Sequence, residues 1–304
     1  MTTSHAARRS VRPRRKGRFR AEHRFAWLFL LPAVGLVAVF RIIPLGWGFL
    51  ISLTDRDGVG QGEFVGLDNY ARAAADGTFR DSVVNMLVLL ATLPIWVMLP
   101  MVLAILIHQG IPGGRLYRAI YFLPAVLSSV IVGAIFNVVL RYDGSLNAAL
   151  GAVGIDAVDW LGDSSTALAS LIAVQLWSTF GMGVLIFLSG LSTVPSDILD
   201  AARIDGARFW QRLFLVIVPS LRPIIEFVAV VTTIGMLTSL FGLIYVLTGG
   251  GPGTATTLPE FLIWLEQGQL NRPGYAAAIS MLLFVFMAGI AWAQVRIMQR
   301  NARI

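Results

Sequence analysis

The sequence contains no cysteine, a single lysine and few charged residues. Without cysteine it can form no disulfide framework, thiolate nucleophile or cysteine-based metal site. Its one lysine, Lys16, does not stand in the Gly-Lys-Ser/Thr step that a nucleotide-binding phosphate loop requires. The histidines His5, His23 and His108 lack ligand-like spacing, and no catalytic constellation is visible. We therefore expect no cofactor and no enzyme activity in this chain.

Apolar residues dominate what remains. Hydrophobic residues make up 56% of the 304 residues, whereas charged residues make up only 13%, about half the usual share of roughly 25% in soluble domains. A water-soluble fold of this size could not bury so much apolar surface, so the bilayer must act as the solvent for much of it.

A membrane-spanning helix needs about 20 mostly apolar residues, and six segments meet this requirement. They must be helical, because an isolated span has to satisfy its own backbone hydrogen bonds, and the short alternating strands of a transmembrane barrel are not seen. The prediction is an all-α, polytopic membrane protein. Its six expected spans cover residues 26–50, 82–107, 119–140, 166–191, 223–247 and 275–295.

Charge placement predicts the orientation. Nine of the 24 basic residues precede residue 25; we interpret segment 1–24 as a disordered cytoplasmic tail that touches membrane lipids and not nucleic acid. With both termini cytoplasmic, 18 basic residues fall on the inner side, and twelve of the 17 acidic residues fall in outer loops. We therefore expect a multi-pass protein of the cell membrane. Two charges lie in or beside spans: Arg41 is expected to snorkel, and Glu226 to pair with Arg222 one turn earlier.

The inner segment 195–220 is not a plain connector. Pro195 and Ser196 are typical of a helix start, and Gly206 permits a tight turn before a second short helical piece. Pro219 is expected to end the element before the next span. Such an element fits a groove on a partner protein, although an amphipathic helix resting on lipid headgroups is also compatible with these residues.

The same segment resembles a known family. Asp200-Ala201-Ala202, then Gly206, then the stretch from Val216 to Pro219 are similar to the EAA loop of binding-protein-dependent ABC importer permeases, with conservative replacements. Other stretches resemble the carbohydrate-uptake branch, above all its maltose-type and glycerol-phosphate-type first subunits. They are FVGLDNY (64–70), YRAIYFLP (117–124), WLGD (160–163), AARIDGA (201–207) and YVLTGGGP (245–252).

The resemblance implies a permease domain over residues 25–304 that forms half of the passage for a sugar or sugar-like solute. It implies a second, homologous permease subunit, two copies of a cytoplasmic ABC ATPase and an extracytoplasmic solute-binding protein. The expected ATPase-coupling residues are Asp200, Ala201, Ala202, Gly206, Val216 and Pro219.

By alignment to the turn after the fifth span, the expected substrate-path residues are Ser239, Leu240, Gly242 and Tyr245. Their types differ from those of a maltose site, so the substrate does not carry over. The near absence of basic residues in the spans favours a neutral sugar over a phosphorylated polyol.

Two alternatives remain open. A secondary carrier driven by an ion gradient would be expected to have broken helices or membrane-embedded charges in symmetric positions, and to bury a carboxylate or histidine near the midplane. The sequence shows none of these. A membrane scaffold or sensor would need neither a solute path nor a docking loop.

Overall fold

The computed structural model describes residues 29–58, 60, 62–108, 121 and 123–301. Apart from one isolated bridge between Thr54 and Phe64, regular structure in these residues is helical. The chain divides into two units, residues 1–50 and 51–304, which are taken in turn. The basic tail predicted at 1–24 lies outside the described residues.

The first unit is an apolar helix. It belongs to the candidate span Phe29–Ser52, which has a mean hydropathy of 2.1 and no buried residue in its most apolar window. The π-helical turn η1 (Ala38–Ile42) contains the exposed Arg41 and is followed by α2 (Ile43–Ser52). A helix that is apolar on its exposed sides is suited to contact with lipid.

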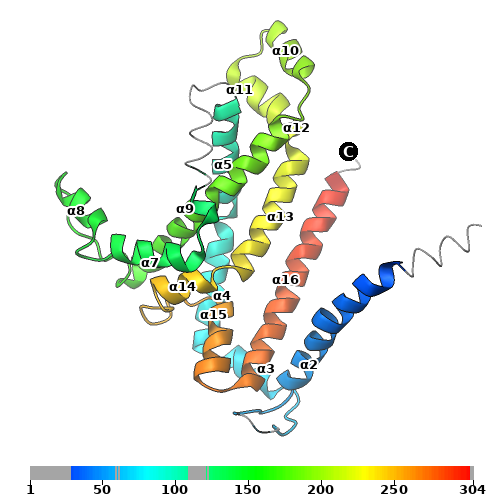
Figure 1. Ribbon diagram of the computed structural model, residues 1–304, viewed down its shortest axis with the longest axis vertical. Helices are drawn as coiled ribbons and strands as arrows, with labels where there is room; N and C mark the ends of the chain where they lie inside the picture. The colour runs from blue at the N-terminus through cyan, green and yellow to red at the C-terminus, as the bar shows by residue number, and fades with distance from the viewer. Residues whose placement is uncertain (1–28, 59, 61, 109–120, 122, 302–304) are drawn as a thin grey trace, which may run out of the picture. The chain divides into compact units, whose positions relative to one another are not determined.

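The second unit is a helical bundle. α4 (Gly77–Ala91) and α5 (Leu93–His108) together make a 32-residue candidate span, and α9 (Ser164–Leu191) makes one of 28 residues. α16 (Pro273–Asn301) forms another. α5 packs along α9, and α13 (Arg222–Thr238) contacts both of these helices and α16 (Figure 1). The observed helices confirm the predicted all-α class.

Two of the expected spans are interrupted in the described residues. In the segment 119–140, the described helix stops after Val126, and α7 (Ser129–Val139) begins with Ser128 as its N-cap. In the segment 223–247, α13 ends at Thr238 and α14 (Phe241–Leu247) begins after Leu240. Two adjacent hydroxyl residues stand at each break, Ser128 and Ser129 or Thr238 and Ser239, but the flanking residues are apolar, so a hydropathy average over a whole span does not reveal the break. Residues 119, 120 and 122 lie outside the described residues.

The inner segment folds into short helices at one end of the bundle. They are α10 (Ser196–Ile204), α11 (Phe209–Arg212), the π-helical η2 (Leu213–Ile217) and α12 (Val218–Ser220). The expected stop at Pro219 is displaced: Pro219 lies inside α12, and the chain bends by 66° between the helix ending at Ser220 and α13. Proline is tolerated there because the first turn of a helix leaves its N–H groups without intrahelical partners.

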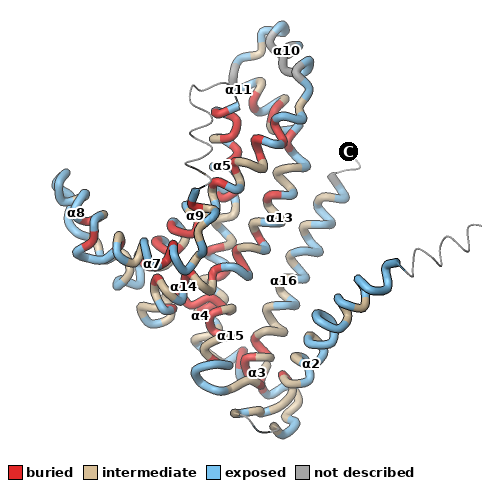
Figure 2. The backbone as a smooth tube through the Cα atoms, viewed as in Figure 1, coloured by how far each residue is buried: buried red, intermediate tan, exposed pale blue. Residues whose placement is uncertain are grey.

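The opposite end of the unit holds α3 (Asp68–Ala75), α15 (Pro259–Trp264) and the π-helical η3 (Leu265–Gln269) (Figure 1). Between α7 and α9 the chain forms α8 (Ser145–Gly151). Figure 2 shows that buried residues gather where α5, α9, α13 and α14 meet, whereas outward faces are exposed. Those faces carry large apolar side chains such as Val285 and Trp292 on α16, as expected of helices that contact lipid.

α14 packs closely on α7. A Cβ added to Gly133 on α7 would lie 3.1 Å from the Cβ of Val246, and one added to Gly242 on α14 would lie 2.7 Å from Ser129 Oγ. Asn137 Nδ2 also donates to the carbonyl oxygen of Leu247 at 3.0 Å. Small residues therefore let the two short helices behave as one packed pair.

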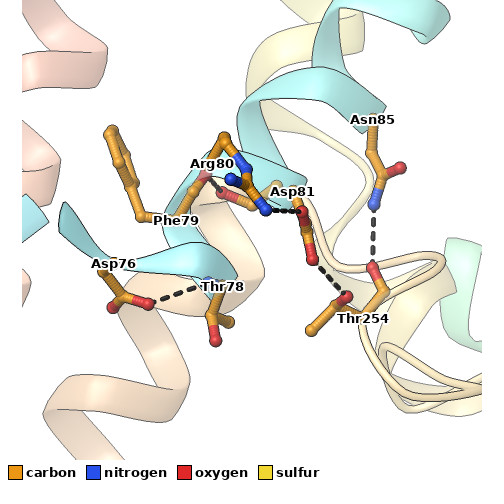
Figure 3. A network of polar contacts seen from close by, with 8 residues as sticks. Asp76, Thr78, Phe79, Arg80, Asp81, Asn85 and Thr254 are labelled. Atoms are coloured by element: carbon orange, nitrogen blue, oxygen red, sulfur yellow. Dashed lines mark hydrogen bonds and ion pairs between the residues drawn. The ribbon is translucent and has the colours of Figure 1, made fainter. Parts of the chain in front are cut away.

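A hydrogen-bonded clamp holds the glycine-rich turn that follows α14 against α4 (Figure 3). Asn85 Nδ2 donates to the carbonyl oxygens of Thr254 at 2.8 Å and Thr257 at 3.0 Å. Thr254 Oγ1 donates to Asp81 Oδ2 at 3.0 Å, and Asp81 also pairs with Arg80. One amide thus satisfies two loop carbonyls far away in sequence, which fixes the loop to a spanning helix.

We predict that Asn85→Leu, which keeps the side-chain size but removes both donors, destabilises the protein by about 2 kcal/mol, at roughly 1 kcal/mol per net hydrogen bond. Thermal unfolding of the detergent-purified chain measures this, with Val84→Leu on the exposed side of α4 as the matched control. Equal melting temperatures for Asn85→Leu and Val84→Leu would contradict the clamp.

Candidate solute cavity and coupling loop

A cavity of about 300 Å³ lies where α5, α9 and α13 meet. Its polar lining comes mainly from two helices: α9 supplies Gln175, Ser178 and Thr179, and α13 supplies Thr232, with Ser239 directly after the end of α13. Trp96 of α5 adds an aromatic wall. None of the described lining residues is charged, so the cavity pairs neutral hydrogen-bonding groups with apolar surface.

Local hydrogen bonds orient these groups. The hydroxyls of Ser178 and Thr179 both donate to the carbonyl oxygen of Gln175 at 2.9 Å, so their oxygens remain able to accept hydrogen bonds. Gln175 is only 7% exposed. Trp96 Nε1 donates to Thr92 Oγ1 at 2.9 Å, which fixes the indole ring. Hydroxyl and amide groups beside an aromatic face suit a polyhydroxylated neutral solute.

Of the four expected path residues, the structure brings only Ser239 to this cavity. Leu240 is fully buried in the core, and Gly242 packs against Ser129 of α7. Tyr245, which is 52% exposed, has ring contacts with Phe241 at 5.9 Å and Trp264 at 5.2 Å.

Sequence reasoning missed the polar contribution of α9. The available signal was the group Gln175, Ser178 and Thr179, which interrupts an otherwise apolar span over one turn of helix. Three polar side chains so close together in a span are expected to face protein or solute and not lipid.

Glu260 was counted with the outer-loop acids, but its side chain reaches the break in the fifth span. Glu260 Oε1 accepts a hydrogen bond from the Leu240 N–H at 2.8 Å. Met86, Leu237 and Leu283 line the gap beside it. Burial in these apolar surroundings raises the pKa of Glu260 to about 7, against the opposing effect of the Leu240 and Phe241 N–H groups.

The inner segment 195–220, the candidate coupling loop, begins with a helix that ends at a glycine. Gly206 has a φ of +73°, and the Ala207 N–H donates to the carbonyl oxygen of Ala202 at 3.0 Å. This six-to-one bond around a left-handed glycine is the Schellman arrangement that ends helices. Ala201 is exposed and Ala202 is half-buried, while the side chain of Asp200 lies outside the described part of the structure.

The next helix has its own cap. The Arg208 N–H donates to Gln211 Oε1 at 2.7 Å, while the Arg212 N–H bonds to the carbonyl oxygen of Arg208. A glutamine three residues into a helix that bonds back to the cap N–H fixes the helix start. Two capped ends around one glycine make the turn well defined.

The far end of the loop is anchored in the bundle. Leu213 and Ile217 are buried in a core cluster that also holds Ile107 of α5 and Leu191 of α9. Val216 is half-buried and Pro219 is exposed. The predicted pair of Arg222 and Glu226 is confirmed, with Arg222 Nε 3.3 Å from Glu226 Oε1.

The loop leaves apolar side chains uncovered. Ile204 is 87% exposed at the end of α10, and Leu215 is 74% exposed in η2. Trp210, whose ring stacks on that of Phe214 at 6.0 Å, is also largely exposed. A rigid loop with this much exposed apolar surface is typical of a contact surface for protein or membrane.

These features agree with the family of the chain. The sequence profile of binding-protein-dependent transport system inner membrane components matches residues 71–302, so the chain belongs to this family. It is a multi-pass membrane protein, a transport component and not an enzyme.

Curated relatives match over nearly the full length. The chain is 34% identical to the multiple sugar-binding transport system permease protein MsmF of Streptococcus mutans, over 91% of this chain and 96% of that protein. It is 32% identical to the trehalose/maltose transport system permease protein MalF of Thermococcus litoralis, over 88% and 90%. The lactose transport system permease protein LacF of Rhizobium radiobacter is 30% identical, over 88% and 92%.

A solved structure has the same fold. A chain of a bacterial ABC transporter involved in the import of the acidic polysaccharide alginate superposes with a TM-score of 0.81 at 21% identity, covering 94% of this chain and 99% of that one. A structure of a bacterial alginate ABC transporter in complex with a periplasmic protein that holds an alginate pentasaccharide gives a TM-score of 0.82, also at 21% identity, and covers 95% and 98%.

The partly buried carboxyl group of Glu260 gives a pH prediction. Because the folded pKa of Glu260 is about 7 and its ordinary value is 4.5, the folded state holds the proton more tightly. Stability is therefore lost as pH rises from about 5 to 8, by roughly 3 kcal/mol at about 1.4 kcal/mol per pKa unit. Glu260→Gln, which stays neutral, should unfold at the wild-type temperature at pH 5 and at a higher temperature at pH 8.

Differential scanning fluorimetry at the two pH values measures the effect. Glu63→Gln, at an exposed glutamate, serves as the control and should keep the wild-type pH dependence. If Glu260→Gln lost as much stability as wild type between pH 5 and pH 8, the assignment of a buried, proton-holding carboxyl group would be wrong.

Proposed function

We propose that the chain forms half of the passage through which an ABC importer takes up a neutral sugar, and that it couples this passage to ATP hydrolysis by a separate ATPase subunit. The observation that carries the proposal is the uncharged cavity between α5, α9 and α13, with Gln175, Ser178, Thr179, Thr232 and Ser239 as hydrogen-bonding groups. Its volume of about 300 Å³ is at the lower end of ligand pockets, which span roughly 300–1,000 Å³. This size suits a small sugar or one end of a longer one.

The remaining partners follow from the relatives. The sugar names of MsmF, MalF and LacF support a sugar as cargo. The alginate transporter structure that includes a periplasmic binding protein supports an extracytoplasmic solute-binding protein as a partner. A second, homologous permease would complete the passage, and two copies of a cytoplasmic ATPase would supply the energy. The basic residues on the inner side support cytoplasmic termini and contact of that side with anionic lipid.

The loop from Asp200 to Pro219 is the proposed ATPase contact. Its turn at Gly206 is closed by a backbone hydrogen bond, and its far end is anchored by Leu213 and Ile217. Motion of a docked ATPase would then pass as a rigid displacement into α9 and α13, whose faces line the cavity. The exposed Ile204 and Leu215 supply apolar contact area for that partner.

We predict that Thr179→Trp fills the cavity and lowers the rate of sugar uptake at least tenfold. Val285→Trp adds the same ring on the exposed side of α16 and should leave uptake near wild type. Uptake of a panel of radiolabelled mono- and disaccharides by membrane vesicles that contain the complete importer measures both. Wild-type uptake by Thr179→Trp, confirmed in the membrane by immunoblot, would refute the cavity as the passage.

We predict that substitutions at Gly206 separate coupling from solute capture. No atom of the described residues lies within 4 Å of a Cβ added to Gly206, and its φ of +73° opposes a side chain. Gly206→Val is destabilised by roughly 1–2 kcal/mol because valine disfavours the left-handed backbone region, whereas asparagine adopts that region more readily. Gly206→Val should lose solute-stimulated ATP hydrolysis while binding-protein affinity stays intact, and Gly206→Asn should keep most of the stimulation. Full stimulation in Gly206→Val would count against the rigid loop.

A further inference from the structure

The fifth span breaks beside the solute cavity. α13 ends at Thr238, Ser239 has φ −127° and ψ 9°, and α14 starts at Phe241. Such a break leaves the first N–H groups of α14 without partners inside the helix. In apolar surroundings an unsatisfied N–H costs several kcal/mol. The position of the break therefore depends on which group accepts a hydrogen bond from these N–H groups.

The Glu260 carboxyl group, on α15, accepts a hydrogen bond at this break. Its Oε1 accepts the Leu240 N–H at 2.8 Å. α15 is itself fixed: Leu258 and Phe261 on either side of Glu260 are buried in the core, and Thr257 Oγ1 donates to the Gly250 carbonyl oxygen at 3.0 Å. The acceptor is therefore delivered by a rigid element.

Other titratable groups near α15 are engaged elsewhere. Asp81 of α4 accepts from Thr254, Glu266 of η3 pairs with Arg272, and the Tyr275 hydroxyl of α16 donates to Asp76. Tyr245 of α14 has ring contacts with Phe241 and Trp264. Among the described residues, Glu260 is the side chain that meets the break.

We propose that Glu260 is a positioning residue of the solute passage: by accepting the Leu240 N–H it fixes the break in the fifth span, and the break sets where Ser239 stands at the cavity. Ser239 directly precedes Leu240, so a shift of the capped peptide moves the Ser239 side chain relative to Gln175, Ser178 and Thr179 on α9. The geometric claim stands by itself, and only its importance for uptake rests on the proposed function.

The chain has no native cysteine, so it adds no background thiol to a labelling test, and the labelled chain can be separated from its partner subunits by electrophoresis. Ser239→Cys is introduced into the full chain, assembled with its partner subunits in membrane vesicles, and its rate of modification by N-ethylmaleimide is measured. Thr179→Cys on α9, which lines the same cavity but not the broken helix, gives the reference rate. The ratio of the two rates cancels changes in reagent access and in pH.

The ratio is compared in three backgrounds. Glu260→Leu removes the acceptor and should change the ratio at least fivefold. Glu260→Gln keeps an oxygen acceptor of the same length and should restore the ratio to within twofold of wild type. Glu63→Leu, at an exposed glutamate, should have no effect. An unchanged ratio in Glu260→Leu would overturn the proposal, as would a Glu260→Gln ratio displaced as far as that of Glu260→Leu.

Glu260→Asp keeps the inference testable if Glu260→Leu does not reach the membrane. Its carboxyl group is one methylene shorter and cannot keep the 2.8 Å contact without movement of the break, so the ratio should change at least twofold. A wild-type ratio in Glu260→Asp would also overturn the proposal. Labelling needs no solute, so its outcome is independent of the uptake assay with Thr179→Trp, and failure of one idea does not imply failure of the other.

Discussion

The backbone hydrogen bond in an apolar medium is the constraint on which this structure depends. Continuous helices satisfy it by themselves, but the third and fifth expected spans are interrupted, and other groups must complete their hydrogen bonding. Ser128 caps α7, and Glu260 meets the Leu240 N–H at the start of α14. Because those contacts are made, α14 can leave the line of α13 and pack on α7, and Ser239 can face the cavity.

The cavity and the loop are connected through shared helices. α9 carries Gln175, Ser178 and Thr179 in its middle and continues to Leu191, which lies in the same buried cluster as Leu213 and Ile217 of the loop. α13 begins at the 66° bend that ends the loop and carries Thr232 and Ser239 on its cavity side. Two of the three cavity walls therefore start or end at the loop. Packed interiors transmit displacement with little compression, so the fold offers a short mechanical route between the two sites.

Hydropathy and the position of Gly206 predicted much of the helical fold and of the inner loop. The apolar runs located the uninterrupted helices, and Gly206 marked a turn that the structure closes with the Ala207-to-Ala202 bond. Spacing one turn apart identified the Arg222–Glu226 pair. Hydropathy did not predict the breaks, since the hydroxyl pairs at 128–129 and 238–239 are too short to lower the average of an otherwise apolar span. From the sequence, Glu260 was assigned to an outer loop, because only the tertiary fold brings α15 to the break in the fifth span. Alignment to the turn after the fifth span predicted Gly242 and Tyr245 as path residues, but it could not predict that Gly242 packs on α7 and that Tyr245 contacts Trp264 of α15.

The central claim is that ATP, hydrolysed by a separate subunit, moves a neutral sugar through this chain. The partly buried Glu260 makes the energy source worth testing directly, because ion-driven carriers also bury carboxyl groups. The most direct measurement is sugar uptake by proteoliposomes that contain the reconstituted importer and its binding protein, with ATP present and the proton gradient collapsed by a protonophore. The account predicts uptake that requires ATP and persists without the gradient. Uptake that does not require ATP and stops when the proton gradient is collapsed would contradict it.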